Sequence, residues 1–431
     1  MITTRYVREH VDEIRQSLQK RKSDYPLDGL LKLDEEWRGL RTRLQELQAR
    51  RNKESLDISK AKKAGEAIDE RVAALGKVKS EIDAIEGELP SYEARIDEML
   101  WNMPNVLHKS VPYGESGEQN VTIRTWGEVG RKSSGSHEEI LARLGMLDVE
   151  RAAKVAGARF YYLKGDLALM EQALVRFALD MLAKRGYTVV SPPYMIRKKY
   201  YRGVTALGDF EDALYRIGDP REVEGKRGYE RVEDDLFLIS TSEHAIAAMH
   251  AEETFSGGQL PLRYAGYSMC FRREAGAHGK DTKGMFRVHQ FYKVEQFIFA
   301  RQDDSWKYFD ELLRNAEDIF QALKIPYRVV DICTGDIGTV AAKKNDIEAW
   351  MPSQGAYREV VSCSNCTDWQ GLRLDIKYDD KGERRYVHTL NSTAVATTRA
   401  LVAIVENYSN SDGSITVPDA LVPYMGKDRI G

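Results

Sequence analysis

The sequence predicts an α+β protein: an N-terminal antiparallel helical coiled-coil arm, followed by a domain with a mostly antiparallel sheet flanked by helices. Three observations lead to this fold class. Within residues 1–105, apolar residues recur at steps of three and four, the period of a coiled coil. Between residues 269 and 299, two runs interleave apolar and charged residues around a glycine-rich segment, as in a β-hairpin. After residue 137, helical stretches alternate with short apolar strands.

The arm is predicted by two apolar runs on either side of a short break. Their members are Leu33, Trp37, Leu40, Leu44 and Leu47, and then Leu75, Val78, Ile82, Ile85, Leu89, Tyr92, Ile96 and Met99. Residues 60–65, which are small or basic, interrupt the pattern. Because so short a break can only reverse the chain, we expect the two helices to pair antiparallel. Helices of roughly 35 residues would give the arm a length of about 50 Å.

Charge is distributed unevenly along the arm, although the whole chain has a formal net charge of −3. Residues 1–63 hold 16 Lys and Arg against 11 Asp and Glu, or +5, whereas residues 64–100 hold 4 against 10, or −6. A long helical hairpin buries little surface of its own, so the basic first helix favours contact with nucleic-acid phosphates. For any single residue, an ordinary solvated charge is the simpler interpretation. The candidate RNA-binding residues are Arg43, Arg50, Arg51, Lys53, Lys60, Lys62 and Lys63.

Composition places the domain boundaries. The Met103-Pro104-Asn105 segment ends the second helix, and residues 102–135 are rich in Gly, Pro, Ser and polar residues. We expect an RNA-binding domain over residues 1–105, a linker over 106–136 and a catalytic domain over 137–431. Within the last, the pattern predicts a helix over residues 166–185 and strands over 188–190, 236–239, 327–331 and 372–378. No Walker loop or GxGxxG motif opens a helix after a strand, which excludes the commonest nucleotide-binding folds.

The overall composition fits a cytoplasmic enzyme with no membrane contact. Of the 431 residues, 42% are hydrophobic and 30% charged, and no apolar run approaches the roughly 20 residues of a membrane span. Residues 1–20 are charged throughout, unlike a secretory signal. Four cysteines, Cys270, Cys333, Cys363 and Cys366, are too few for a disulfide framework and indicate a reducing compartment. Since no second CxxC accompanies Cys363 and Cys366, no zinc is expected.

The predicted hairpin carries charge among apolar residues. Arg272 and Glu274 lie in its first run, and Arg287 and Glu295 lie in its second, taken over residues 286–299. The connector, residues 275–284, is glycine-rich and basic, so we expect a mobile loop suited to a polyanion. A buried charge costs several kcal/mol unless it is paired. The pattern therefore indicates either a structural network of salt bridges or a site for a charged ligand.

The same hairpin resembles motif 2 of class II aminoacyl-tRNA synthetases, and its detail is similar to the seryl-tRNA synthetases. Residues 239–244 resemble the family's amino-acid-binding motif, with Ser242 where alanine is commoner. Residues 357–370 are similar to the strand that supplies metal ligands in this family. Residues 390–399, followed by an apolar helix over 400–406, resemble motif 3, with Ala394, Ala396 and Thr397 where the class often has glycine. Residues 186–193 resemble motif 1, which forms the dimer interface in class II enzymes.

The resemblance implies roles in ATP binding. Arg272 would bridge the amino-acid carboxylate and the α-phosphate, while Arg287 and Arg399 would bind the outer phosphates. Glu274 would contact the adenine side and Phe291 would stack on the base. Val288, Val360 and Val361 complete this set, and Arg273 is left between ATP and the RNA acceptor end. Glu359 and Ser362 would hold Mg²⁺ with oxygen ligands. Among these, Arg272, Arg399 and Glu359 are the candidate catalytic residues.

The resemblance also implies a serine pocket. Glu295 and Thr241 would bind the ammonium, with Ser242 and Glu243 beside them, and Thr393 and Glu359 would meet the hydroxyl. A site built around a substrate hydroxyl can reject an analogue without it by roughly 10⁴-fold, because its own polar groups would be left unpaired.

By this resemblance the protein is a homodimer that joins L-serine to tRNA(Ser), gripping the RNA with the coiled-coil arm across the dimer. Charging of tRNA(Sec) stays open, as do two other functions: a non-catalytic RNA-binding paralogue and an amino acid:carrier protein ligase. The arm argues against the second of these, because such ligases lack it. Residues 208–232 carry no periodicity, and we expect a mobile loop there near the serine pocket.

Overall fold

The computed structural model describes residues 3–206, 213–217, 221–223, 226–228, 235–274 and 284–431. Most of the two segments predicted as mobile loops, within 208–232 and 275–284, lies outside these ranges. Chain contacts divide the molecule into a first unit that ends at Val106 and a second unit, Leu107–Gly431. No helix in the described ranges is long and apolar enough to span a membrane.

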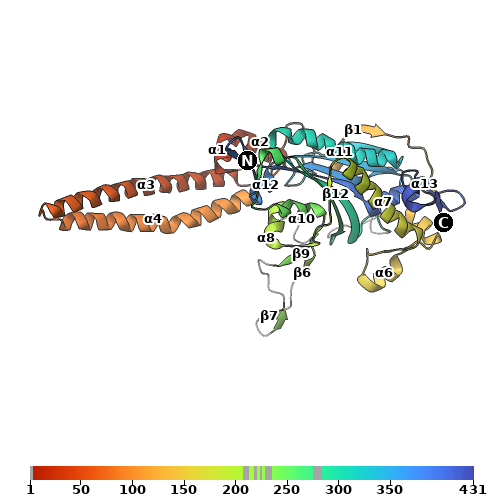
Figure 1. The fold of residues 1–431 in the computed structure, drawn as a ribbon, viewed down its shortest axis with the longest axis horizontal. Coiled ribbons are helices and arrows are strands. Elements are labelled where there is room, and N and C mark those ends of the chain that lie inside the picture. The colour runs from red at the N-terminus through yellow and green to blue at the C-terminus, as the bar shows by residue number, and fades with distance from the viewer. Residues whose placement is uncertain (1–2, 207–212, 218–220, 224–225, 229–234, 275–283) are drawn as a thin grey trace. The chain divides into compact units, whose positions relative to one another are not determined.

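The first unit consists of four helices, α1 (Thr4–Glu9), α2 (Val11–Lys20), α3 (Leu27–Lys63) and α4 (Asp69–Asn102). The two long helices, α3 and α4, run antiparallel side by side and form the arm (Figure 1). The buried residues between them are members of the predicted repeat: Leu44, Leu47, Val78, Ile82 and Leu89. The predicted antiparallel coiled coil is therefore confirmed.

The reversal between the two helices differs slightly from the predicted break. Helix α3 continues to Lys63, so the basic residues 60–63 form its last turn instead of interrupting it. There they face the negative end of the helix dipole, which favours cations. The chain then turns at Gly65, whose φ of +78° is a left-handed conformation that glycine adopts without strain. The Glu66 N–H donates to the Ala61 carbonyl at 3.0 Å and closes the helix end.

At the opposite end of the arm, α1 and α2 pack against α3 and α4. Val7, Ile14 and Leu30 belong to this cluster. Among them Asp34 is buried, and its carboxylate accepts two hydrogen bonds from Arg8 Nη1, at 2.7 and 2.8 Å. This pairing offsets the cost of burying the charge.

The second unit is built on one eight-stranded sheet. Its strand order is β1-β13-β14-β15-β18-β12-β11-β4, and every neighbouring pair is antiparallel except β11 and β4. The strands are β1 (Val121–Trp126), β4 (Thr188–Val190), β11 (Leu262–Phe271), β12 (Gln290–Ala300), β13 (Tyr327–Asp331), β14 (Lys343–Met351), β15 (Ala356–Asn365) and β18 (His388–Ala396). The predicted mostly antiparallel sheet is thus confirmed.

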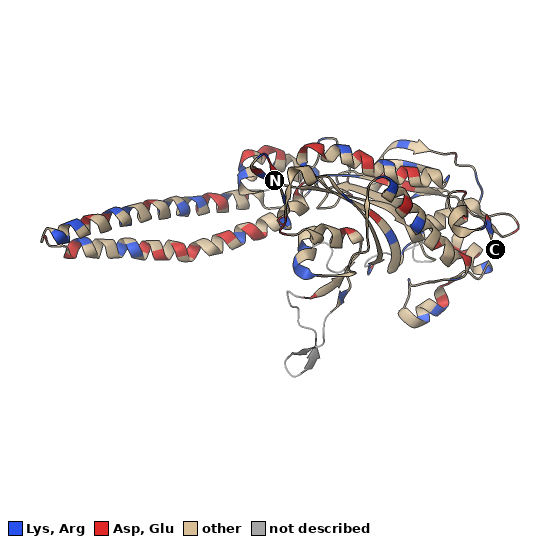
Figure 2. Cartoon of the chain, viewed as in Figure 1, with Lys and Arg blue, Asp and Glu red and all other residues tan. Residues whose placement is uncertain are grey.

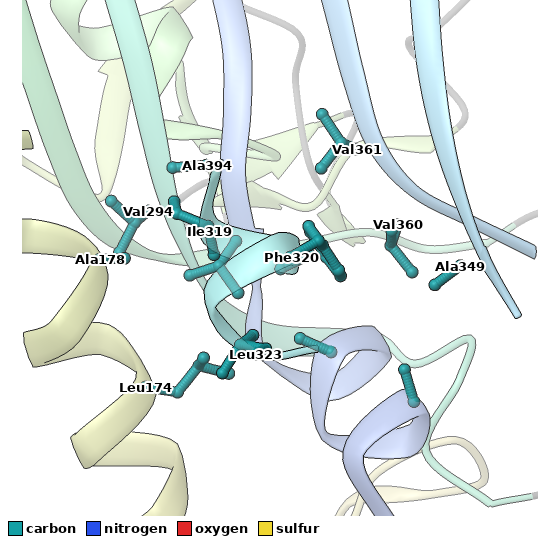
Figure 3. Close-up of a cluster of buried hydrophobic side chains, with 14 of the residues drawn as sticks. Leu174, Ala178, Val294, Ile319, Phe320, Leu323, Ala349, Val360, Val361 and Ala394 are labelled. Carbon is teal, nitrogen blue, oxygen red and sulfur yellow. The ribbon is translucent and has the colours of Figure 1, made fainter. Parts of the chain in front are cut away.

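Helices cover both faces of this sheet. On one face, α7 (Asp166–Lys184), α11 (Ser305–Ala322) and α13 (Thr397–Tyr408) enclose the main core. Figure 3 shows part of that core, with Leu174 of α7 and Phe320 of α11 pointing toward the sheet. On the other face, α10 (Ser242–Met249) packs against Phe297 and Phe299 of β12. Strand β12 is therefore buried on both sides, which explains why its apolar alternation is incomplete.

The remaining elements are short. The helices are α5 (His137–Arg143), α6 (Val149–Ala156), α8 (Lys198–Val204), α12 (Trp369–Arg373) and α14 (Val422–Met425), with 3₁₀ turns η1 (Gly117–Gln119), η3 (Gly257–Gln259) and η5 (Gln302–Asp304). The strands are β2 (Leu147–Asp148), β3 (Tyr162–Leu163), β5 (Met195–Arg197), β6 (Arg216–Ile217), β7 (Arg221–Val223), β8 (Lys226–Gly228), β9 (Leu236–Leu238), β10 (Thr254–Ser256), β16 (Lys377–Asp380), β17 (Glu383–Tyr386), β19 (Ile415–Thr416) and β20 (Arg429–Ile430).

Three predicted elements differ from the structure. The second run of the hairpin becomes a strand only at Gln290, so Arg287 precedes β12. Residues 372–378 are not one strand: the chain forms α12, turns at Asp375 with a φ of +53°, and then enters β16. Residues 106–136, predicted as a linker, contain β1, which pairs with β13 at the edge of the main sheet.

A buried hydrogen bond joins the start of α5 to α13. His137 Nδ1 lies 3.3 Å from Glu406 Oε1, and His137 Nε2 accepts a hydrogen bond from the Met285 N–H at 3.4 Å. Burial acts to raise the pKa of Glu406, but hydrogen bonds from His137 and Ser353 outweigh it and lower that pKa. His137 and Glu406 thus fix the position of Met285, which lies in the segment leading into β12.

This anchor requires glycine at position 284. Its φ is +67°, and a Cβ there would lie 2.3 Å from His137 Nε2. We expect Gly284→Ala to reduce the free energy of unfolding by about 2–4 kcal/mol, the sum of backbone strain and displacement of the imidazole. Chemical denaturation of the purified variant measures this loss. Gly355→Ala is the matched control, because the φ of Gly355 is +58° and, among the described residues, no atom beyond its chain neighbours lies within 4 Å of a Cβ placed there. Equal losses in the two variants would contradict the anchoring role.

Candidate active site

A cavity of about 520 Å³ opens on the face of the sheet that carries α10. Its walls come from segments far apart in the sequence: the start of α10, the end of β11, and strands β12, β15 and β18. Residues 336–341, which precede β14, and Arg399 of α13 complete it. A larger cavity of about 900 Å³ lies between residues 129–139 and the turn joining β14 to β15, and none of the predicted site residues lines it.

Two β-bulges direct side chains into the smaller cavity. Between β14 and β15 the register passes from Ile347 opposite Val361 to Glu348 opposite Glu359, which leaves Val360 unpaired. Side chains three residues apart on a regular strand face opposite sides, but this bulge lets Glu359 and Ser362 line the same cavity.

The second bulge lies between β12 and β18. Val294 pairs with Val395 and Glu295 pairs with Thr393, which leaves Ala394 out of register. Thr393 and Ala396, also three residues apart, therefore both line the cavity. The shift brings the Thr393 hydroxyl to 3.4 Å from Glu295 Oε2.

At one end of the cavity, buried charges of both signs meet. Lys293 and Glu295 lie two residues apart on β12 and form an ion pair, with side chains only 6% and 2% exposed. Burial raises the pKa of Glu295, and the positive charges of Lys293 and Arg272 oppose that effect. The site can therefore hold a small cation beside a hydroxyl-sized group.

Glu243 forms the floor of the same end. Its Oε1 accepts hydrogen bonds from Gln370 at 2.8 Å and from Asn391 at 3.0 Å. Burial, together with repulsion from Glu295, raises the pKa of Glu243 to about 7. The carboxyl thus titrates near neutral pH in the empty cavity.

Arg272 lies between this end and the rest of the cavity. Its Nε donates to the Ser240 carbonyl at 3.4 Å, and its guanidinium carbon lies 5.3 Å from the centre of the Phe291 ring. A guanidinium held against an aromatic face keeps its fork free to contact two anions.

At the other end, positive side chains gather around one carboxylate. Arg399 Nη1 lies 3.1 Å from Glu359 Oε1, and Lys344 Nζ lies 3.4 Å from Asp346 Oδ2. Desolvation alone would raise the pKa of Glu359, but the charges of Arg399, Lys344 and Arg272 outweigh it and lower that pKa. Three cations around one half-exposed carboxylate leave room for an added polyanion.

Between the two ends lies Glu274, the last described residue of the first hairpin run. Its φ is +47°, and its carbonyl accepts a hydrogen bond from Arg159 Nη1 at 2.9 Å. The Glu274 carboxylate pairs with Arg287 Nη1 at 3.1 Å. The two charged residues predicted on opposite runs therefore do meet, just outside the paired strands.

The structure gathers most, but not all, of the predicted site residues. Those that line the cavity are Thr241, Glu243, Arg272, Glu274, Phe291, Glu295, Glu359, Val360, Ser362, Thr393 and Arg399. Five others do not line it. Ser242 is buried and donates to the Gly266 carbonyl at 3.3 Å, Arg273 is exposed, Arg287 pairs with Glu274, and Val288 and Val361 pack in the core.

Sequence reasoning assigned no role to several lining residues. Lys293 and Lys344 each lie two residues from a carboxylate on the same strand face, a spacing that could have drawn notice. His244 is buried beside the Tyr201 ring, with 4.6 Å between ring centres, and its Nδ1 has no hydrogen-bond partner within the described ranges. Burial lowers the pKa of His244 to about 3, so it is neutral.

Two observations bear on metals. Within the described ranges, no cluster of three or more His, Cys, Asp or Glu side chains could hold a metal ion. The four cysteines are buried, and no disulfide joins any of them within the described ranges. Glu359 and Ser362 offer oxygen atoms alone, which suits a hard cation completed by ligand oxygens.

In the first unit, all seven predicted RNA-binding residues lie on α3. In Figure 2, the ribbon of α3 carries many Lys and Arg positions among its acidic ones, and that of α4 carries mostly Asp and Glu positions. Arg43 pairs with Glu81 of α4 at 3.1 Å, and Arg50 pairs with Glu54 at 2.6 Å. Lys53, Lys60, Lys62 and Lys63 are exposed, and no ion pair with them is found in the described part of the chain.

Comparisons with known proteins cover the whole chain. A model of the seryl-tRNA synthetase N-terminal domain matches residues 1–107, and one of the tRNA synthetase class II core domain (G, H, P, S and T) matches residues 223–408. A serine–tRNA ligase of Thermococcus sibiricus is 48% identical, over 100% of this chain and 97% of that protein.

Solved structures agree with these matches. The seryl-tRNA synthetase of Pyrococcus horikoshii complexed with ATP has a TM-score of 0.92 and 45% identity, over 100% of this chain and 99% of that one. The cytoplasmic serine–tRNA ligase of Naegleria fowleri in complex with AMP has a TM-score of 0.86 and 38% identity, over 97% and 95%.

Proposed function

The chain belongs to the seryl-tRNA synthetase family of class II aminoacyl-tRNA synthetases, and from this premise we propose how its cavity carries out the reaction. It is a serine–tRNA ligase, an ATP-dependent enzyme, so the family predicted from the motifs is confirmed. The observation that supports the assignment of roles is the convergence of Arg272, Glu295, Glu359 and Arg399 from separate segments on one cavity.

The reaction has two steps. A serine carboxylate oxygen attacks the α-phosphorus of ATP, the bond from that phosphorus to the bridging oxygen breaks, and pyrophosphate leaves. A hydroxyl at the 3′ end of tRNA(Ser) then attacks the seryl carbonyl carbon, and AMP leaves. Since the first step joins two anions without a proton transfer, alignment and charge neutralisation supply most of the acceleration.

Serine occupies the end of the cavity that holds the buried charges. Its ammonium binds Glu295 and Thr241, with Glu243 beside them, and its hydroxyl meets Thr393 and Glu359. The proposal is supported by the 3.4 Å contact between Thr393 and Glu295, which places a hydroxyl partner next to an anion. Ser242 contributes by position only, because its hydroxyl is engaged with Gly266.

ATP occupies the end lined by Arg399 and Lys344. Arg272 contacts both the serine carboxylate and the α-phosphate, since it lies between the two ends of the cavity. Phe291 stacks on the adenine and Glu274 contacts its edge, while Arg399 and Arg287 bind the outer phosphates. Val288, Val360 and Val361 contribute backbone to this site. Arg273 is exposed, and contact with the RNA acceptor end suits it better than contact with ATP.

Mg²⁺ fits the residues at the phosphate end. Glu359 and Ser362 offer a carboxylate and a hydroxyl on one side of the bulge. Asp346, which does not line the cavity, is buried and pairs with Lys344 at 3.4 Å, so Glu359 and Ser362 are the proposed protein ligands. When bound, the ion supplies neutralisation of phosphate charge. Two protein oxygens and the phosphates themselves are a common set of Mg²⁺ ligands.

The arm binds tRNA(Ser) through the phosphates of its backbone, using Arg43, Arg50, Arg51, Lys53, Lys60, Lys62 and Lys63. The exposed lysines are the strongest support for this proposal, because no ion pair with a described residue would have to be broken before they bind an RNA phosphate. We further propose a cytoplasmic homodimer in which the arm of one protomer serves the cavity of the other. Strand β4 supports the dimer: it ends the sheet, and Val189 on it is 48% exposed.

ATP–pyrophosphate exchange with the purified protein tests the activation step. We expect exchange with serine and with none of the other nineteen amino acids, because the cavity holds one cation seat and one hydroxyl seat. Exchange with a different amino acid would contradict the assignment of Thr393 and Glu359, and absence of any exchange would contradict the activation chemistry.

The hydroxyl seat can be tested through Thr393→Val. We expect the KM for serine to rise at least tenfold and the preference for serine over alanine to fall, with the KM for ATP changing less than about threefold, because the Thr393 hydroxyl serves the serine end of the cavity and not the phosphate end. Thr389→Val is a matched control on the same strand, since the Thr389 hydroxyl is buried without a partner among the described residues. An unchanged serine preference in Thr393→Val would refute the role.

For the arm, we expect a triple variant, Lys60→Glu, Lys62→Glu and Lys63→Glu, to lower kcat/KM for tRNA at least tenfold at about 0.15 M salt while leaving serine-dependent exchange unchanged. Aminoacylation measured over a range of salt concentrations reports the loss. Lys77→Glu with Lys79→Glu on α4 serves as the control for charge reversal, since both residues are exposed. Equal losses in the two variants would mean that net charge, and not the tip of α3, determines tRNA affinity.

A further inference from the structure

Lys293 holds a position that the proposed roles leave unused. It lies on the same face of β12 as Glu295, lines the same cavity and forms an ion pair with that carboxylate. Both side chains are almost wholly buried, at 6% and 2% exposure. Two buried charges held this closely are expensive to separate, so the ammonium determines both the charge and the direction of its partner.

The surroundings of Glu295 explain why it needs such a partner. Glu243, from the start of α10, faces the same end of the cavity, and the two carboxylates repel each other. His244 of α10 is neutral because burial lowers its pKa, and Cys270 of β11 is neutral because burial raises its pKa. Thr393 of β18 contributes only a hydroxyl.

Among the described groups around Glu295, positive charge therefore comes from Lys293 and Arg272. Arg272 has a second task, because the proposed reaction requires it at the serine carboxylate and the α-phosphate. Only Lys293 is dedicated to Glu295 throughout the reaction. Without it, the pKa of a carboxyl at 2% exposure beside another carboxyl would rise further, because nothing dedicated to it would offset the burial and the repulsion.

We propose that Lys293 is a positioning residue for serine: its ammonium keeps the Glu295 carboxylate ionised and directed at the serine seat. The incoming α-ammonium then meets an anion already in place and does not have to bind a neutral acid. This inference rests on the proposed placement of serine beside Glu295.

Lys293→Met tests the proposal, since it keeps the length and the buried stem of the side chain and removes the charge. We expect the KM for serine at pH 7 to rise at least tenfold, while the KM for ATP changes less than about threefold. The serine KM of the variant should fall as the pH is raised, because loss of the ammonium raises the pKa of Glu295 further and the carboxyl then ionises only at higher pH. The pH midpoint of this change should lie about one unit or more above that of the wild type.

Two further variants separate positioning from folding. Lys293→Arg retains a cation and should keep the wild-type pH midpoint. Lys343→Met removes the lysine of another half-buried pair, 3.0 Å from Asp331 and outside the cavity, and should leave the serine KM unchanged. Calorimetric binding of ATP and thermal unfolding, measured on every variant, report whether the fold and the phosphate end are intact.

Several outcomes would overturn the inference. They are an unchanged serine KM in Lys293→Met, an equal rise in the KM values for serine and ATP, or a pH midpoint that does not move. If Lys293→Met fails to fold, Lys293→Gln replaces it, and loss of ATP binding in both would assign Lys293 to the fold. Absence of serine-dependent exchange in the wild type would instead refute the placement of serine on which the inference rests.

Discussion

The balance of charge inside the sheet is the constraint on which the site depends. Strand β12 is covered on both faces, yet it carries Lys293 and Glu295 with their side chains away from water. Such charges persist only if they neutralise one another or a ligand. At the serine end, two carboxylates face two cations, so a zwitterion can enter without changing the net charge. At the phosphate end, Arg399 and Lys344 face Glu359 and Asp346, and Arg272, shared between the two ends, adds the positive charge that favours a ligand with several negative charges.

The strands that line the cavity also contribute side chains to the hydrophobic core. The two bulges allow one strand to serve both the core and the cavity. A slip of one residue turns every following side chain to the other face. At Val360, this change places Val360 and Val361 both in the core and returns Ser362 to the cavity (Figure 3). At Ala394, the bulge places Ala394 and Val395 both in the core, while Thr393 and Ala396 line the cavity. Packing on one face therefore fixes where the reactive groups lie on the other.

Sequence alone could predict the arm and the charged residues on which the proposed chemistry of the cavity depends. The heptads of α3 and α4 are long and regular, so their period is unambiguous, and the motifs carry Arg272, Glu295, Glu359 and Arg399 in recognisable order. The bulges could not be foreseen, because strict alternation puts Glu359 and Ser362 on opposite faces. Sequence reasoning gave Lys293 no role, because a spacing of two residues from Glu295 does not by itself show that the two side chains form a buried pair. Strand β1 was missed because it lies in a polar segment and is exposed along most of its length.

The arm has a consequence for how such proteins diversify. Beyond the part that α1 and α2 cover, the buried residues of α3 and α4 pack against one another across the pair, so this part of the arm is a one-dimensional structure whose stability adds up locally. Insertion of seven residues into each helix would preserve every existing contact and lengthen the arm by about 10 Å. An insertion into one helix alone would shift the register of everything beyond it. The arm can therefore change its length only by equal insertions or deletions in α3 and α4. Such a change would alter the reach of the arm without altering the packing at its tip or at its base.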